Sequence, residues 1–294
     1  MKLFFYRGKY PNFGDELNTW LMPKVFPNFF DDDERELFLA IGSILYDSHP
    51  KNSQKIVFGS GYGGYTSPPT LDGSWTVYCV RGPRTADACG LGRDKVAGDT
   101  AILINRHRDR PLETPTRVAF MPHWESLERG AWQNACRLAG IHFIDPRRPV
   151  EEVLDEIQAS STLVTEAMHG AIVADALRVP WIPALPLHAS HRFKWFDWSE
   201  ALDMNLAPHS LWPSSAREAF VAVKQRDSYK LVYPQGVVAL GVRAADAAFS
   251  MMAAARLWQL ARREPVLSSD VALDRVLDRL ETNAAQIKKD FPRG

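Results

Sequence analysis

The chain has 294 residues, a length that suits two domains of average size. Hydrophobic residues make up 46% and charged residues 24%, which is an ordinary globular composition and excludes a largely disordered chain. Lysine plus arginine and aspartate plus glutamate number 35 each, so the sequence lacks the basic excess that is typical of nucleic-acid-binding proteins.

The cysteines and the N-terminal residues indicate the cellular compartment of the protein. Cys79, Cys89 and Cys136 are too few and too scattered for a disulfide framework or a paired-cysteine metal site. The first apolar run, residues 3–6, is followed directly by Arg7, so it predicts neither a secretory signal nor a membrane span. We therefore expect a cytoplasmic protein without transmembrane segments.

Short apolar runs alternate with helical patterns through the first two thirds of the chain. Residues 106–116 carry no periodicity and predict a linker between two such series. The pattern predicts an α/β fold of two Rossmann-like domains that face a central cleft, residues 1–110 and 115–265. The expected strands are 3–6, 37–41, 55–58, 76–80 and 101–104 in the first series, and 117–121, 141–144, 162–165 and 181–183 in the second.

The last part of the chain predicts helices. Residues 237–263 are alanine-rich, and residues 271–289 carry apolar side chains at helical spacing. We expect residues 266–294 to form a C-terminal helix that packs back on the N-terminal domain. The helix before Glu264 also carries Arg243, Arg256, Arg262 and Arg263, a pattern that suits a membrane surface, although ordinary packing is favoured.

Polar side chains and glycines follow several of the predicted strands. Asn12-Phe13-Gly14-Asp15 opens a helix after the first strand, where Asp15 suits a bond to a sugar hydroxyl; the alternative is helix capping by Asn12 and Asp15. Gly59-Ser60-Gly61-Tyr62-Gly63-Gly64 predicts an anion cradle or a plain turn.

Two arginines follow the fourth predicted strand, at Val80-Arg81-Gly82-Pro83-Arg84-Thr85. Guanidinium groups bind carboxylates and phosphates, so Arg81 and Arg84 predict an anionic substrate; surface ion pairing is the alternative. Gly98-Asp99-Thr100 precedes a predicted strand, so we expect it to be a turn at the opposite end of the sheet.

Histidines mark the corresponding edge of the second predicted sheet. His169 lies where a strand passes into a helix, with Gly170 allowing close approach and the helix dipole directed at the site, and a core histidine is the alternative. His123 also follows a strand. The segment 188–198 combines histidines, cations and aromatic rings and predicts a binding surface. His188 and His191 lack the partners of a zinc motif, so no metal is expected.

Taken in order, six motifs resemble the polysaccharide pyruvyl transferase family, in the branch of exopolysaccharide ketal-pyruvyltransferases that includes the succinoglycan and xanthan enzymes. The resemblance covers about residues 1–200. It implies a GT-B-like fold, phosphoenolpyruvate as the donor, and a lipid-linked oligosaccharide acceptor at the inner face of the plasma membrane. The motifs are Asn12-Phe13-Gly14-Asp15, Gly42-Ser43-Ile44-Leu45, Phe58-Gly59-Ser60-Gly61, Val80-Arg81-Gly82-Pro83-Arg84-Thr85, Gly98-Asp99 and Met168-His169-Gly170.

The resemblance also implies roles for residues. His169 would protonate the enol carbon of the donor, Asp15 would orient or deprotonate sugar hydroxyls, and no cofactor or metal is implied. Several family members have an arginine two residues before this histidine, where this chain has Ala167. We expect donor contacts from Arg81, Arg84, Met168, Gly170, His123, Arg192 and Lys194, and acceptor contacts from Asn12, Gly14, Ser60 and Trp195.

Two other functions fit the same residues. A nucleotide-sugar glycosyltransferase would use the same fold with a different donor, since a fold does not determine a function. A non-catalytic glycan-binding protein would need the binding surface without the proton transfers. The acceptor sugar, the ketal positions and the oligomeric state are not predicted.

Overall fold

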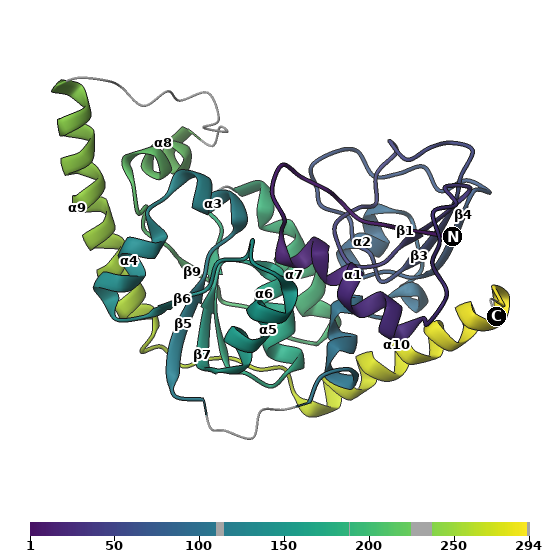
Figure 1. Cartoon of the computed structure of the whole chain (residues 1–294). Helices are drawn as coiled ribbons and strands as arrows, with labels where there is room; N and C mark the ends of the chain where they lie inside the picture. Colours follow the sequence, from purple (N-terminus) through teal and green to yellow (C-terminus); the bar gives the residue numbers. More distant parts are fainter. Residues whose placement is uncertain (110–114, 188, 225–236, 293–294) are drawn as a thin grey trace.

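The computed structural model describes residues 1–109, 115–187, 189–224 and 237–292. The elements form two α/β halves, each built on its own parallel sheet (Figure 1). The centre of the predicted linker, residues 110–114, lies outside the described residues, as does His188.

The first half contains a four-stranded parallel sheet in the order β1-β2-β3-β4. Its central strands are short apolar runs buried on both faces, as parallel sheets require. Pro83 occupies the first turn of α2, where its missing N–H costs nothing. The elements are β1 (Lys2–Phe4), α1 (Phe13–Val25), β2 (Glu36–Leu39), β3 (Gln54–Phe58), β4 (Trp75–Cys79), α2 (Pro83–Ala88) and the 3-10 helix η1 (Arg93–Lys95).

One expected strand of this half is wrong. Residues 101–104 lie within a 3-10 helix, η2 (Thr100–Arg106), instead of joining the sheet. This helix packs against α1 and against two later helices, α6 (Met168–Ala176) and α10 (Asp270–Asp290). The Asp99 side chain accepts a hydrogen bond from the backbone N–H of Ala101 at 3.0 Å. This cap turns the chain into a helix, and the following apolar side chains are buried by helices rather than by neighbouring strands.

The second half contains a five-stranded parallel sheet in the order β6-β5-β7-β8-β9. The strand order reverses between β5 and β7, and ligands of doubly wound sheets bind outside the carboxyl ends of the strands at this point. The elements are β5 (Arg117–Met121), α3 (Trp124–Arg129), α4 (Trp132–Ala139), β6 (His142–Phe143), α5 (Val150–Gln158), β7 (Ser160–Thr165), α6 (Met168–Ala176), β8 (Trp181–Leu185) and β9 (His209–Ser210).

Later helices connect the halves. α7 packs on α2, and α10 runs along the first half, where Tyr78 donates a hydrogen bond to Asp290 at 2.6 Å and Arg279 donates one to the Val96 carbonyl at 3.3 Å (Figure 1). Ser269 caps α10. These elements are the 3-10 helix η3 (Ala189–His191), α7 (Phe193–Ala201), α8 (Ala216–Lys224), α9 (Val237–Leu260) and α10 (Asp270–Asp290).

The alanine-rich helix α9 has a buried and an exposed face. Leu257 and Leu260 are buried against the second half, whereas Met251, Met252 and Trp258 are about half exposed. The side chain of Arg243 lies outside the described residues. Among the described helices, none combines the length and the apolar character that crossing a membrane requires.

The buried carboxyl of Glu218 on α8 makes the fold sensitive to pH. Burial, together with the charge of Glu166, raises the pKa of Glu218 from 4.5 to about 7. The folded protein therefore keeps a proton on this group that the unfolded chain releases, and the stability it contributes falls as the pH rises from 4.5 to about 7.

Compared with Glu218→Gln, the wild-type protein should lose free energy of unfolding as the pH rises from 4.5 to about 7. Urea titrations at several pH values measure the difference, and a constant difference would contradict the prediction.

Candidate active site

A pocket of about 360 Å³ lies between the carboxyl edges of the two sheets, in the volume range of small-molecule sites. Both halves contribute polar and aromatic side chains to it. The lining from the first half includes Tyr6, Asn12, Asp15, Ser43, Tyr46 and Tyr65, and the lining from the second half includes His123, Trp124, Glu125, His169, His191 and Lys194. The pocket thus lies at the reversal of strand order between β5 and β7.

A buried carboxylate joins the two loops at this reversal. Glu166, directly after β7, accepts hydrogen bonds from the backbone N–H of His123 at 2.9 Å and from the Ser126 hydroxyl at 3.0 Å. His123 ends the loop after β5, and His169 lies in the first turn of α6, the helix after β7. Glu166 therefore fixes the relative position of the loops that carry the two histidines.

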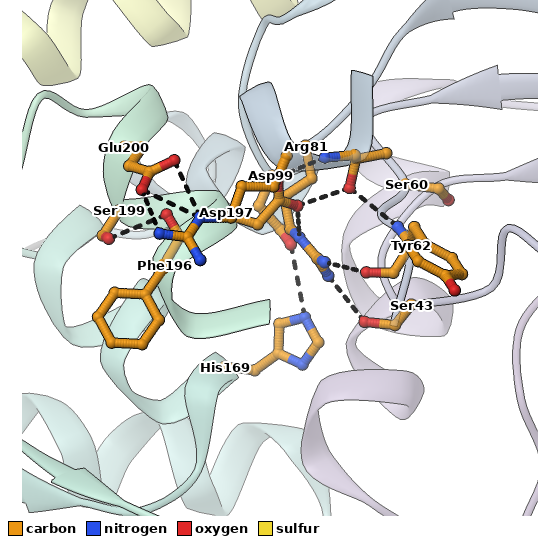
Figure 2. Close-up of polar contacts among 12 residues, drawn as sticks. Ser43, Ser60, Tyr62, Arg81, Asp99, His169, Phe196, Asp197, Ser199 and Glu200 are labelled. Atoms are coloured by element: carbon orange, nitrogen blue, oxygen red, sulfur yellow. Dashed lines mark hydrogen bonds and ion pairs between the residues drawn. The ribbon is translucent and has the colours of Figure 1, made fainter. Parts of the chain in front are cut away.

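The His169 ring reaches across to the first half. Its side chain is 13% exposed, and its Nε2 faces the carboxylate of the fully buried Asp99 at 3.7 Å (Figure 2). Gly14 makes this approach possible, because a Cβ at that position would lie 1.9 Å from Nδ1 of His169. Nε2 thus lies on the side of Asp99, at a distance too long for a hydrogen bond, and Nδ1 lies on the side of Gly14.

Asp15 lies beside His169 in the pocket lining. Its Oδ2 accepts a hydrogen bond from the Asn12 side-chain amide at 2.7 Å. Burial raises the pKa of Asp15, while the Asn12 hydrogen bond and the charges of His169 and Lys194 oppose the increase. A carboxylate with a raised pKa accepts a proton more readily near neutral pH, so Asp15 is a candidate general base.

The Arg81 guanidinium lies inside the interface between the halves and is not part of the pocket lining. It is fully buried and donates from Nε to Asp197 at 2.8 Å, from Nη1 to the Ser43 hydroxyl at 2.8 Å and from Nη2 to the Tyr62 carbonyl at 2.8 Å (Figure 2). Asp197 also accepts bonds from the backbone N–H and hydroxyl of Thr85. Arg81 therefore joins α7 to the first half, and its direct contact with a donor stays a prediction.

The structure brings some of the other predicted residues to the pocket. Lys194 and His123 both line it. Burial lowers the pKa of His123 well below its ordinary value, and the positive charges of His191 and Lys194 act in the same direction. His123 is therefore neutral near pH 7 and can offer a hydrogen bond but no charge.

Other predicted residues lie elsewhere. Arg84 pairs with Glu200 at 2.6 Å and lies over the Phe196 ring, which is the surface ion pair weighed as its alternative. Trp195 is fully buried beside Trp181 in the core, which corrects the expectation that its ring faces an acceptor sugar. The remaining residues do not line the pocket: Ser60 donates to the Ala40 carbonyl at 2.5 Å, Met168 is in the core, Gly170 packs against Met121 and Thr165, and Arg192 donates to the Pro186 carbonyl at 3.3 Å.

Sequence reasoning missed several residues near the site. Asp99 was expected at the opposite end of the sheet, yet it faces His169 because the following residues form a helix. Tyr65 and Glu125 line the pocket, and each lies within a few residues of a motif that had been singled out. His191 lies in the segment 188–198 that predicts a binding surface, but the sequence assigns it no individual role beyond the zinc pair that it excludes. Position after a strand was the signal that could have found Glu125.

Among the described residues, His123, Glu125 and His191 could also hold a metal ion. Their ligand atoms lie within 4.8 Å of one another. His191, however, already has hydrogen-bond partners at both ring nitrogens, Tyr65 at 3.0 Å and Glu125 at 2.9 Å. These hydrogen bonds satisfy both ring nitrogens of His191 and one oxygen of Glu125, and the His123 Nδ1 accepts from the backbone N–H of Glu125 at 3.4 Å.

The buried pair of Arg81 and Asp197 predicts a large effect on stability. Asp197→Ala should lower the free energy of unfolding by about 3–5 kcal/mol, because it leaves the guanidinium buried without its counterion. Glu200→Ala, on the same helix, removes the half-exposed partner of Arg84 and should cost below about 1 kcal/mol. Denaturant titrations of the two variants measure the contrast, and equal losses would contradict it.

Comparisons with known proteins identify the family of the chain. The family model described as polysaccharide pyruvyl transferase matches residues 9–186. The chain is 33% identical to the succinoglycan biosynthesis protein ExoV of Rhizobium meliloti (strain 1021), over 99% of this chain and 100% of that protein. No solved structure matches significantly. The chain therefore belongs to the polysaccharide pyruvyl transferase family and is an enzyme of that class.

Proposed function

We propose that the protein transfers the pyruvyl group of phosphoenolpyruvate to a hexose of an exopolysaccharide repeat unit and forms a cyclic pyruvate ketal. The observation that carries this proposal is the pocket between the sheets, where Asp15, His169 and Lys194 meet aromatic side chains. The similarity to a protein of succinoglycan biosynthesis supports the exopolysaccharide acceptor. We also propose that the two α/β halves correspond to the domains of a GT-B-like fold.

The donor would bind against the second half. Phosphoenolpyruvate carries a carboxylate and a phosphate, and the pocket offers Lys194 and the N-terminus of α6, whose free N–H groups attract anions. Lys194 supplies a positive charge to the pocket, whereas Ala167, at the position where several family members have an arginine, supplies none. Arg81 does not line the pocket, and we propose that it holds the loops that position the donor, while its direct contact with the donor stays a prediction.

The reaction needs two bonds to carbon C2 of the donor. In the first step a sugar hydroxyl adds to C2, its proton passes to Asp15, and His169 protonates C3. C3 becomes a methyl group, and C2 then carries both the sugar oxygen and the phosphate. In the second step another hydroxyl of the same sugar attacks C2, and the bond between C2 and the phosphate oxygen breaks. One inorganic phosphate leaves for each ketal formed.

The acceptor would lie against the aromatic part of the pocket. Tyr46, Tyr65 and Trp124 line it, and aromatic faces stack on the apolar faces of sugar rings. We propose that this sugar belongs to a lipid-linked oligosaccharide at the cytoplasmic face of the membrane. The exposed Met251, Met252 and Trp258 of α9 suit a peripheral contact with that surface.

Incubation with phosphoenolpyruvate and a lipid-linked repeat unit tests the function. We expect one phosphate per glycan, and a mass gain of the glycan equal to pyruvate less water. His169→Ala should lower kcat by roughly 10²–10⁴-fold. A parallel incubation with a UDP-sugar separates the glycosyltransferase alternative, because release of UDP with transfer of the sugar would contradict the proposal. Binding of glycan without either product would identify a non-catalytic protein.

The contact between Gly14 and His169 gives a second test. Gly14→Ala would displace the ring, since the added Cβ would lie 1.9 Å from Nδ1, and we expect kcat to fall by about 10²-fold. Gly73→Ala is the matched control, because a Cβ there meets nothing within 4 Å. Steady-state kinetics and thermal unfolding of both variants measure the effect. Full activity of a folded Gly14→Ala protein would contradict the proposed role of His169 in the reaction.

A further inference from the structure

The pocket contains a chain of hydrogen bonds that the proposed roles of His169 and Asp15 leave unused. The phenol oxygen of Tyr65 lies 3.0 Å from Nδ1 of His191, and Nε2 of His191 lies 2.9 Å from the Glu125 carboxylate. Tyr65 comes from the loop after β3, and the other two residues come from the second half. All three line the pocket.

Charge determines the direction of these hydrogen bonds. Burial favours the protonated form of Glu125, but its hydrogen bond with His191 and the nearby positive charges, Arg129 and Lys194 among them, oppose this effect, and the pKa of Glu125 is lowered. The ionised carboxylate accepts from Nε2–H of His191. In the neutral imidazole that carries its proton on Nε2, which is the starting state of a relay, Nδ1 accepts from the Tyr65 O–H. The order of groups, a hydroxyl, an imidazole and an orienting carboxylate, is the arrangement that activates hydroxyl groups in enzymes.

Packing holds each member of this chain in place. Arg129, itself buried, lies 3.3 Å from the carboxylate of Glu125. The His123 ring lies against His191 with a 4.4 Å centroid separation. Gly63 leaves room for the Tyr65 ring, because a Cβ there would lie 2.5 Å from ring carbons. Tyr65 is about half exposed and lines the pocket, where a substrate can approach it.

We propose that Tyr65, His191 and Glu125 form a proton relay that serves the second hydroxyl of the acceptor sugar. This rests on the proposed function, whose first step already uses Asp15 and His169. The second hydroxyl gives its proton to Tyr65 as the Tyr65 proton passes to Nδ1 of His191, and Glu125 stabilises the imidazolium. The hydroxyl oxygen bonds to C2, and phosphate leaves with the electron pair of the bond between C2 and the phosphate oxygen. The relay then returns its proton to the departing phosphate.

This assignment makes the two steps separable. Removing the relay blocks ring closure but leaves the first addition intact, so the enzyme should accumulate an open adduct in which C2 carries both the sugar oxygen and the phosphate. Removing His169 should prevent the adduct from forming.

Conservative variants test the relay. Tyr65→Phe removes only the hydroxyl, and Glu125→Gln keeps the size of the side chain. We expect each to lower kcat for phosphate release by at least about 10²-fold. The KM for phosphoenolpyruvate should change by less than about threefold, because neither variant removes a group assigned to the donor. Mass spectrometry of quenched single-turnover reactions should detect the open adduct.

Matched controls lie nearby in the chain. Tyr62→Phe removes a hydroxyl in the same loop, whose partner is the Thr66 carbonyl, and Glu128→Gln changes a carboxylate on α3 that pairs with Arg147. Neither side chain lines the pocket. Both control variants should retain wild-type kcat.

The outcomes separate the relay from the proposed function. Phosphate and ketal from the wild-type protein, with unchanged kcat in folded Tyr65→Phe and Glu125→Gln, would overturn the relay alone. Loss of activity in these variants without an open adduct would overturn its place in the second step. The purified wild-type protein could also contain one equivalent of zinc that is lost, together with activity, in His191→Ala. That result would overturn the relay and identify His123, Glu125 and His191 as a metal site. No ketal from the wild-type protein would overturn the proposed function itself.

Discussion

The buried ion pair between Arg81 and Asp197 holds together the two halves that build the pocket. Arg81 follows the last strand of the first sheet, and Asp197 lies on α7, after the second sheet. The guanidinium also binds Ser43 and the Tyr62 carbonyl, so one buried cation connects α7 with the loops after β2, β3 and β4. Desolvating such a pair is costly, and the surrounding hydrogen bonds offset that cost. The pocket geometry depends on this connection.

Topology explains why the chemistry gathers at one place. The second sheet reverses its order between β5 and β7, and the loops at that point carry His123 and His169. The first sheet presents Asp15 and Tyr65 from its own carboxyl edge. Residues of distant sequence therefore form two clusters in one pocket, Asp15 with His169 and Tyr65 with His191 and Glu125, which suits the proposed reaction because it moves protons from two hydroxyls of one sugar.

Much of the fold and part of the site could be predicted from the sequence, because apolar runs, glycines and polar residues at strand ends are local signals. Asp15 and His169 followed from such signals. Asp99 did not, because whether residues 101–104 join a sheet depends on the helices that cover them. Trp195 was misplaced because an aromatic residue in a polar segment can face either the core or a ligand. The partner of Arg81 lies 116 positions away, a pairing that no local pattern encodes.

The most direct test of the central claim is the reaction with phosphoenolpyruvate in ²H₂O, followed by NMR of the glycan product. Addition of a hydroxyl to C2 with protonation at C3 by a solvent-exchanged group predicts one deuteron in the methyl group of each ketal and one inorganic phosphate released for each ketal. A glycan without a pyruvyl methyl signal, or a ketal methyl that carries no deuterium, would contradict the account.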